Sequence, residues 1–489
     1  MAIDKITASG LGDGGVSTAD IADGAITTAK IANNAVTDAK ATITVTPAAV
    51  SDTANTSTGG FTMPSGTTAQ RPGSPDTGES RMNTTTGSLE FYDGSGWVST
   101  NLIPNISSIT GDINNAYATN LVFAVTNNTD TVDIVFLEGG VVFHTVTGQA
   151  VSSGGFTLAT PSQVYGQTAG DTISIQIKNV DGTPSGNSIT KTVVAAPTGG
   201  TITTSGNYRI HSFTSSGNFI NTNTLSLDYL IVAGGAGGGG GANATWHGGG
   251  GGGAGGLIYL TGQSRTAGTH SVVVGTGGSG GAGGSSTSNH GGNGNNSTFN
   301  GSTATGGGGG GPGLPGTSVA NSGGSGGGNG GGNSTPNYSS GTSGQGNRGG
   351  SSLSTSGPGG DPYGAGGGGA GGVGGNDGQH IAGPGGAGLN NSITGSAVGY
   401  AGGGGGGNAT DGSDYAGNAG GTSGVATHGG GAGGGAYPNN TSVSGSRSVG
   451  SNGTNGTGGG GGGGSGGTPQ YNGGSGGSGI VIIRYDMTA

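Results

Sequence analysis

Aspartate and histidine are the side chains of the C-terminal half that could do acid–base or metal chemistry. Hydrolysis by paired carboxylates needs two of them a few ångströms apart, and Asp411 and Asp414 are the only close pair between residues 234 and 479. The small polar residues around that pair favour a solvated turn. His380 and His428 have no partners at metal-ligand spacing. We therefore expect no catalysis, no metal site and no cofactor.

Runs of pure or nearly pure glycine recur through the same half of the chain. A phosphate-binding loop ends in Gly-Lys-Ser or Gly-Lys-Thr, and none of these runs has that ending. The runs are therefore expected to have a structural role. They occupy residues 237–241, 248–253, 306–311, 326–332, 366–369, 402–407, 429–435 and 458–464.

The stretches between the glycine runs carry most of the aromatic and histidine side chains of this half. Such side chains on anchored loops suit binding to sugars and protein surfaces, because they give large contact areas at low entropy cost. They could equally cover the glycine segments or lie at the opposite end. The candidate receptor-binding residues are Trp246, His247, Tyr338, Tyr363, His380, Tyr400, Tyr415, His428, Tyr437 and Tyr471.

The composition excludes several classes of protein. Of 489 residues, 130 are glycine, and 12 Lys and Arg against 22 Asp and Glu give a net charge of −10. This sign argues against a nucleic-acid partner, which requires clustered cations. The longest apolar runs, at 229–233 and 480–483, are too short to cross a membrane. The N-terminus lacks the charged-then-apolar layout of a signal peptide. We expect a soluble protein without membrane insertion.

Residues 1–41 carry an apolar residue every five positions, as at Ile21, Ile26, Ile31 and Val36. A single helix or strand does not keep that spacing on one face. Stacked β-arcs or three chains wound together would do so, and we expect a pentad-repeat attachment and shaft segment. An alanine-rich amphipathic helix is the alternative.

Residues 42–103 read as short strands joined by tight turns such as Asp93-Gly94-Ser95-Gly96. The segment is too short to bury Leu89, Phe91 and Trp97 alone, so it is expected to need partner chains. The pattern TAQRP…NTTTG…E.YDG..W resembles a module of phage tail fibres. That resemblance implies a small trimeric β-meander.

Residues 104–197 contain alternating apolar and polar runs at a spacing near ten residues, for example 121–125 and 173–177. Turn residues such as Glu138-Gly139-Gly140 separate the runs. This pattern predicts an immunoglobulin-like β-sandwich that serves as a spacer.

Residues 198–489 form the glycine-rich part, with strands expected at 202–220, 225–232 and 479–485, and hairpins or strands at 257–274 and 297–305. Polyglycine can be ordered as polyproline II-type helices whose N–H and C=O groups point outward. Those groups need partners, and fixing glycine costs about as much as each hydrogen bond returns. We therefore expect several helices packed in layers. A disordered linker is the alternative.

The sequences DYLIVAGGAGGGGG at 228–241 and SGIVIIRY at 478–485 resemble the glycine-rich tip adhesins of phage long tail fibres. That resemblance implies layered polyglycine II helices whose loops bind a host receptor at the distal end. Here the adhesin part continues from a shaft-like N-terminal half.

These observations together predict a mostly β fibrous protein with a β-type repeat shaft, a small trimeric β-meander, an immunoglobulin-like β-sandwich and a C-terminal polyglycine II helix sandwich. The expected function is attachment of a virion to a protein or glycan receptor on a bacterium. The expected partners are other virion tail proteins in a homotrimer, with the chain in the tail fibre and extracellular after lysis. A self-assembling protein of an extracellular filament or surface layer is the alternative function.

Overall fold

The protein is described from a computed structural model. The pentad repeat of residues 1–41 and the start of the next segment, up to residue 62, lie outside the described residues. The structure describes residues 63–85, 88–100, 104–126, 131–152, 154–179, 187–242, 247–284, 289–314, 319–332, 337–352, 363–378, 381–409, 428–435, 448–467 and 469–488.

Nearly all of the regular structure is β, which confirms the expectation of a mostly β protein. The helices among the described residues are short, namely η3 (Thr68–Gln70) and α1 (Ser162–Tyr165). The chain divides into two compact units, residues 1–101 and 102–489.

The first unit contains a four-stranded sheet. Its strands, in sheet order, are β1 (Ser65–Gly66), β2 (Ser80–Asn83), β3 (Ser88–Tyr92) and β4 (Trp97–Thr100). β1 pairs with β2 in parallel, and the other neighbours are antiparallel. The turn between β3 and β4 is held by Asp93, whose carboxylate accepts the N–H groups of Ser95 and Gly96 at 2.8 Å.

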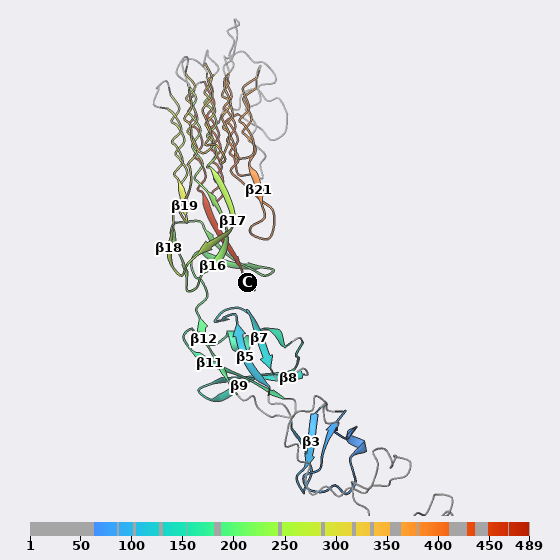
Figure 1. Ribbon diagram of the computed structural model, residues 1–489. Helices are drawn as coiled ribbons and strands as arrows, with labels where there is room; N and C mark the ends of the chain where they lie inside the picture. Colours follow the sequence, from blue (N-terminus) through green and yellow to red (C-terminus); the bar gives the residue numbers. More distant parts are fainter. Residues whose placement is uncertain are drawn as a thin grey trace, which may run out of the picture. The chain divides into compact units, whose positions relative to one another are not determined.

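Two sheets share one hydrophobic core in the N-terminal part of the second unit (Figure 1). The first sheet contains β10 (Gly155–Ala159), β7 (Asn120–Thr126) and β5 (Asn105–Thr110). The second contains β6 (Ile113–Asn114), β12 (Ile189–Val194), β11 (Thr172–Asn179), β8 (Thr131–Glu138) and β9 (Val141–Ala150). Side chains alternate between buried and exposed along β7 and β11, so one face of each sheet meets the core.

The remaining strands belong to the glycine-rich part of the second unit. A five-stranded sheet contains β13 (Thr201–Ser205), β14 (Tyr208–Phe213), β23 (Ile480–Asp486), β16 (Leu225–Val232) and β17 (Leu257–Arg265), in that order. The two-stranded pairs are β15 (Gly217–Asn221) with β18 (Gly268–Val272), β19 (Ser297–Phe299) with β20 (Ser302–Ala304), and β21 (Leu389–Asn391) with β22 (Val398–Tyr400). β17 and β18 therefore pair with β16 and β15 and do not form a hairpin with each other.

β16 and β23 are antiparallel neighbours at the centre of the five-stranded sheet, although the glycine-rich chain lies between them in sequence. Leu227 and Ile231 on one face of the sheet pack in one cluster, whereas Leu230 and Val232 on the other face pack in a second cluster. Apolar burial on both faces explains the continuous apolar runs at 229–233 in and after β16 and at 480–483 in β23.

Beyond β16 the chain runs to and fro in extended segments that hydrogen bond to one another (Figure 1). Successive N–H groups of segment 234–242 donate in turn to three neighbouring segments, so that every third N–H group bonds to the same neighbour. The three neighbours are 289–295, 471–477 and 247–253. The donor and acceptor pairs are Gly234–Asn295, Gly237–Gly292, Gly240–Asn289, Gly235–Gly477, Gly238–Gly474, Gly241–Tyr471, Ala236–Gly253, Gly239–Gly250 and Ala242–His247. We call the segments of residues 233–478 that pack in this way the glycine lattice.

Candidate functional site

Close contact between backbones requires glycine at the centre of the glycine lattice. A Cβ atom on Gly238 would overlap the carbonyl group of Gly462, and one on Gly241 would overlap the carbonyl group of Ser465. These obstacles are backbone atoms, so a larger residue would push two segments apart. The glycine runs are thus explained by backbone packing on backbone, and this packing fixes where the intervening stretches emerge.

The glycine lattice has two ends. One end continues into β16, β17 and β23, and we call it the sheet end (Figure 1). At the opposite end the N–H group of Ala242 donates to the carbonyl of His247, and that of Gly467 donates to the carbonyl of Ala242, both at 2.9 Å. The N–H group of Gly466 donates to the carbonyl of Asn408 at 2.9 Å. We call the end formed by these five residues the outer end.

The residues that flank several stretches outside the described residues are bonded near the outer end, and three such stretches serve as examples. The N–H group of Gly240 donates to the carbonyl of Asn289 at 3.0 Å, and that of Gly435 donates to Oγ of Ser448 at 2.9 Å. The three stretches are 243–246, 285–288 and 436–447. The lattice therefore gathers sequences that lie far apart in the chain.

Of the candidate binding residues, His247 and Tyr471 lie together at the outer end. The N–H group of Ala242 donates to the carbonyl of His247 at 2.9 Å, and that of Gly241 donates to the carbonyl of Tyr471 at 3.0 Å. Both side chains are partly exposed. The structure thus places two aromatic side chains, more than 200 residues apart in sequence, beside adjacent residues of one segment.

Tyr338 is the most exposed of the described candidates, at 41%. The guanidinium carbon of Arg348 lies 3.8 Å from the centre of its ring, which is a cation–π contact. Their segments are joined by a hydrogen bond from the N–H group of Gly349 to the carbonyl of Ser339 at 3.0 Å. Arg348 was not predicted to be a receptor contact, although it is the only charged residue of the stretch 333–348, which also contains Tyr338.

Tyr363, Tyr400 and His428 differ from the expectation of exposed contacts, because all three are buried. Tyr363 is 1% exposed and packs with Ala382 and Ala409. Tyr400 packs in the core of the sheet end, where burial raises the pKa of its phenol. His428 is 8% exposed. Its carbonyl accepts the N–H group of Gly402, which lies two residues after Tyr400 at the sheet end. These three side chains offer little surface to a partner.

The other four candidates lie outside the described residues. They are Trp246, His380, Tyr415 and Tyr437. Trp246 and Tyr437 belong to stretches whose flanks are bonded at the outer end.

The family comparison reports on this same part of the chain. Residues 214–486, more than half of the chain, match the glycine-rich domain family. The chain belongs to that family. The comparison with curated proteins gave no match. Because the matched range runs from just before β15 into β23, the glycine-rich domain includes both the central strands and the glycine lattice between them.

Asparagine side chains replace backbone acceptors along the rims of the glycine-rich domain. Each Oδ1 atom accepts an N–H group of the neighbouring segment. The pairs are Asn452–Ser475 at 2.9 Å, Asn455–Ser478 at 3.0 Å, Asn293–Gly309 at 2.9 Å and Asn296–Gly306 at 2.8 Å. In both sets the asparagines are three residues apart, which is the period of the lattice. We call these four residues the rim asparagines.

His211 on β14 is a buried titratable group at the sheet end of the glycine-rich domain. Its Nδ1 atom lies 2.7 Å from the carbonyl oxygen of Gly199 and must carry the proton, because a carbonyl only accepts. Its buried Nε2 atom has no hydrogen-bond partner among the described residues. Burial lowers the pKa of His211 to about 4, and the charge of Arg209 adds to the effect. The imidazole is therefore neutral at pH 7.

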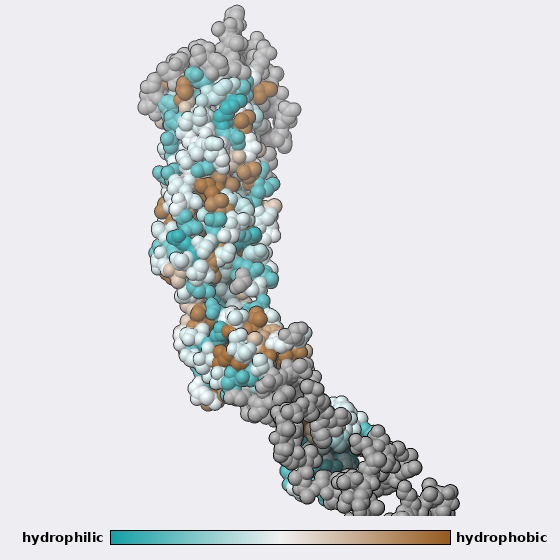
Figure 2. Space-filling model, in the orientation of Figure 1, coloured by the Kyte–Doolittle hydropathy of each residue, from teal (hydrophilic) through white to brown (hydrophobic). Residues whose placement is uncertain are grey.

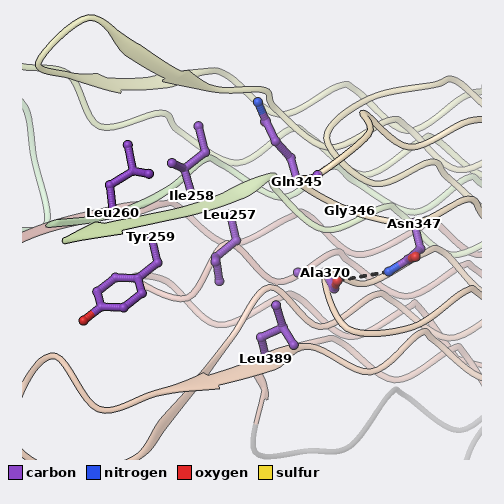
Figure 3. Close-up of a pocket in the computed structure, with 10 residues that line it drawn as sticks. Leu257, Ile258, Tyr259, Leu260, Gln345, Gly346, Asn347, Ala370 and Leu389 are labelled. Carbon is purple, nitrogen blue, oxygen red and sulfur yellow. Dashed lines mark hydrogen bonds between the residues drawn. The ribbon is translucent and has the colours of Figure 1, made fainter.

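A cleft of about 440 Å³ lies beside β17 (Figure 3). Tyr259, Leu260 and Leu389 give it apolar surface and are each more than a third exposed. On the opposite wall, Nδ2 of Asn347 donates to the carbonyl of Ala370 at 3.0 Å, so this amide braces the backbone. Figure 2 shows such apolar spots scattered among near-neutral and polar surface.

The described ranges contain no cluster of three or more His, Asp or Glu side chains that could hold a metal ion. Within the same ranges, no helix has the length and apolar character to cross a bilayer.

Proposed function

We propose that this chain is a phage tail-fibre protein that attaches a virion to a receptor on the bacterial surface. The observation that carries the proposal is that described residues far apart in the chain, such as Ala242 and Gly435, meet at one end of a lattice bonded on three sides. These residues flank the stretches 243–246 and 436–447. A rigid support lowers the entropy cost of presenting binding loops. The receptor is a protein or a glycan. The proposal gives the chain no catalytic role and no cofactor.

We also propose that the glycine segments are polyglycine II helices. The period of three in the N–H directions of segment 234–242 supports this, because the polyproline II-type helix has three residues per turn. The close approach of Gly238 to the carbonyl of Gly462 supports it too, since only side-chain-free helices pack at such a spacing.

The remaining parts of the chain receive roles in the same proposal. Residues 1–41 attach the fibre to other virion tail proteins, and residues 42–103 form a trimeric module, so the chain is a homotrimer. Residues 104–197 are an immunoglobulin-like spacer, which the shared core of their two sheets supports. The protein is then located in the virion, and extracellularly after lysis.

The receptor contacts in this proposal are the candidates at or near exposed surface. Among described residues these are His247, Tyr471 and Tyr338, the last with Arg348. Beyond them are the candidates outside the described residues, namely Trp246, His380, Tyr415 and Tyr437. Aromatic rings beside small polar residues suit both sugar faces and protein loops.

A self-assembling filament or surface layer is the competing function. A lattice that grows by adding copies needs open rims whose N–H groups are free to donate to the backbone carbonyls of a further copy. The rim asparagines instead satisfy such groups within the chain, as Asn452 does for Ser475. Edge N–H groups that are already hydrogen bonded within the chain cannot pair with another copy, which prevents edge-to-edge growth. This favours a discrete adhesin.

Adsorption to host cells tests the proposal. Replacing residues 437–446 by two glycines should lower particle adsorption by at least about tenfold, since several contacts are lost at once. The matched control replaces Thr394 and Ser396, in the turn between β21 and β22 at the sheet end, by alanine and should adsorb normally. Normal adsorption of the loop variant, or absence of the chain from virions in electron micrographs with specific antibody, would contradict the proposal.

A further inference from the structure

The sheet of the first unit buries polar side chains where a sheet normally buries apolar ones. Among the described residues of the range 63–98, the buried side chains are Arg81, Asn83 and Glu90, and all three are polar. The covered face of a sheet normally carries apolar residues. Tyr92 and Trp97 share this face but are only half-buried, so burial there supplies less of the hydrophobic free energy that usually stabilises a fold.

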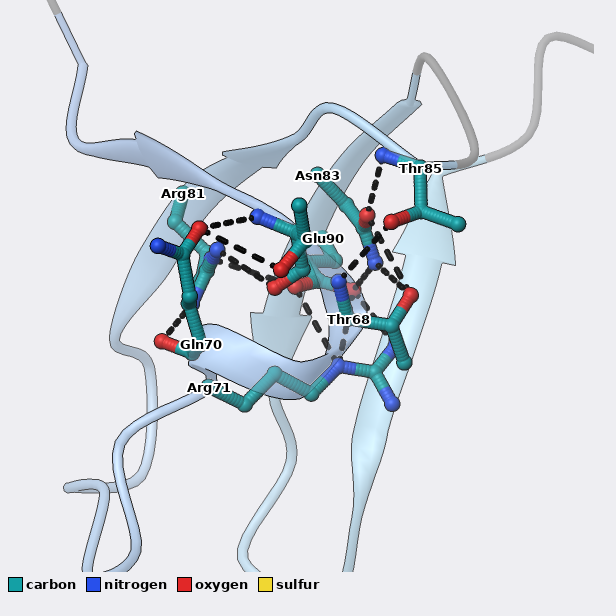
Figure 4. Close-up of polar contacts among 8 residues, drawn as sticks. Thr68, Gln70, Arg71, Arg81, Asn83, Thr85 and Glu90 are labelled. Carbon is teal, nitrogen blue, oxygen red and sulfur yellow. Dashed lines mark hydrogen bonds and ion pairs between the residues drawn. The ribbon is translucent and has the colours of Figure 1, made fainter.

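Ion pairs and hydrogen bonds link the polar side chains on this covered face (Figure 4). We call them the charge network. Nη2 of Arg71 lies 2.6 Å from Oε2 of Glu90, and Nδ2 of Asn83 donates to the same oxygen at 2.9 Å. Nη1 of Arg81 donates to the carbonyl of Gln70 at 2.6 Å. The hydrogen bond from Arg71 holds the pKa of Glu90 below its usual range. Both arginines thus pair with Glu90 within the unit.

The opposite face of the same sheet is apolar and open. Met82 pairs with Leu89, and Phe91 pairs with Val98, in the strand register. Each of these residues neighbours a polar residue along its strand, so strand alternation places all four on the face away from the charge network. Met82 is 39% and Val98 is 38% exposed, and the other two are half-buried. We call these four residues the apolar face.

We propose that the apolar face packs against the same face of other copies of this chain. The four-stranded sheet spans only residues 65–100, and a sheet of this size usually needs disulfides, metals or other chains to be stable. This chain has no cysteine. Each copy carries a net charge of −10, so copies repel over most of their surface. The apolar face contains no charged residue, and identical faces can meet there without like charges in contact.

This inference deepens the proposed function, because it assigns the contact surface of the homotrimer to four named residues. The competing occupant is the segment 1–62 of the same chain, which leads directly into β1. An intramolecular cover and an intermolecular contact differ in one measurable respect. Only the second brings Val98 of one copy near Val98 of another.

Cross-linking of the full-length chain tests the inference. Because the chain has no native cysteine, Val98→Cys introduces a unique thiol that a bifunctional maleimide can join to its copy. The matched control is Val141→Cys on β9, where the valine is 70% exposed. We expect at least about fivefold more covalent dimer and trimer from Val98→Cys than from the control, because packed faces raise the effective concentration of the thiols.

Adding Met82→Lys to the Val98→Cys chain should reduce the covalent product to the level of the control. Cross-linking of Val98→Cys at the control level, as expected if residues 1–62 cover the face, would overturn the inference. Cross-linking that persists undiminished with Met82→Lys would overturn it as well. The reaction reports assembly and not adsorption, so a chain that binds no bacterium can still pass this test, and the two proposals fail separately.

Discussion

Asp228 on β16 and Arg484 on β23 are register partners, and Nε of Arg484 donates to Oδ2 of Asp228 at 3.0 Å. The two residues are 256 positions apart in sequence, and each side chain is 19% exposed. Oδ1 of Asp228 accepts the N–H group of Gly262 on β17 at 3.0 Å. One carboxylate thus joins three strands of the sheet through which the chain enters and leaves the glycine lattice.

Arg484→Met should lower the free energy of unfolding by about 1–2 kcal/mol, because Asp228 is left half-buried without its cation. The double variant Asp228→Asn/Arg484→Met should regain part of this loss, since no unpaired charge remains. Thermal melts followed by circular dichroism measure both changes. An Arg484→Met chain that melts like the wild type would show that the pair does not stabilise the sheet.

Gly238→Ala should destabilise the glycine-rich domain by about 3 kcal/mol or more, because the added methyl group overlaps the backbone of Gly462 and two segments must separate. Gly378→Ala is the matched control, since the nearest atom to its added Cβ lies 4.0 Å away. Limited proteolysis and melting temperature report the difference. Equal stability of the two variants would refute the close packing.

Acidification should destabilise the sheet end through His211. Its pKa in the folded protein is about 4, below the ordinary 6.5. Between these values the unfolded chain binds a proton that the folded chain does not, so stability falls as pH decreases through this window. The full loss is about 3 kcal/mol. His211→Asn, which keeps a donor for Gly199, should show a smaller fall in melting temperature between pH 7 and pH 4. Identical pH profiles would remove His211 as the cause.

Asn452→Ala/Asn455→Ala should cost about 0.5–1.5 kcal/mol for each lost hydrogen bond and leave the N–H groups of Ser475 and Ser478 without acceptors. We expect light scattering to detect concentration-dependent association of the variant, because open rims invite pairing with another copy. Asn218→Ala on β15 is the control. A variant that stays as discrete as the wild type would show that rim closure does not limit growth.

The strands at both borders of the glycine tract are readable from the sequence, because continuous apolar runs such as 229–233 and 480–483 need burial on both faces. The sequence also indicates that the tract is ordered, since variable stretches interrupt its glycine runs. Its pairing partners are not readable, because a glycine carries no side chain that specifies its neighbour. The segment 257–274 therefore reads locally as a hairpin or as separate strands, and in the structure its β17 pairs with β16.

The candidate residues show the same limit. Tyr400 and Tyr338 both lie between glycine runs in the sequence, but Tyr400 is buried at the sheet end and Tyr338 is exposed beside Arg348. Which end a stretch occupies depends on how many segments precede it and on their directions. Local composition contains neither quantity, so burial of Tyr363 and His428 could not be inferred from it.

The amino-acid sequence by itself determined the β character of the chain, its glycine-rich domain and the positions of the bordering strands, since apolar patterning and composition act locally. Only the tertiary structure decided that Asp228 meets Arg484, that His247 and Tyr471 share one end, and that Met82 and Val98 face outward. These arrangements arise from contacts between segments far apart in the chain. Because the glycine backbones of the lattice are nearly identical, the way in which all segments pack together determines which of them meet.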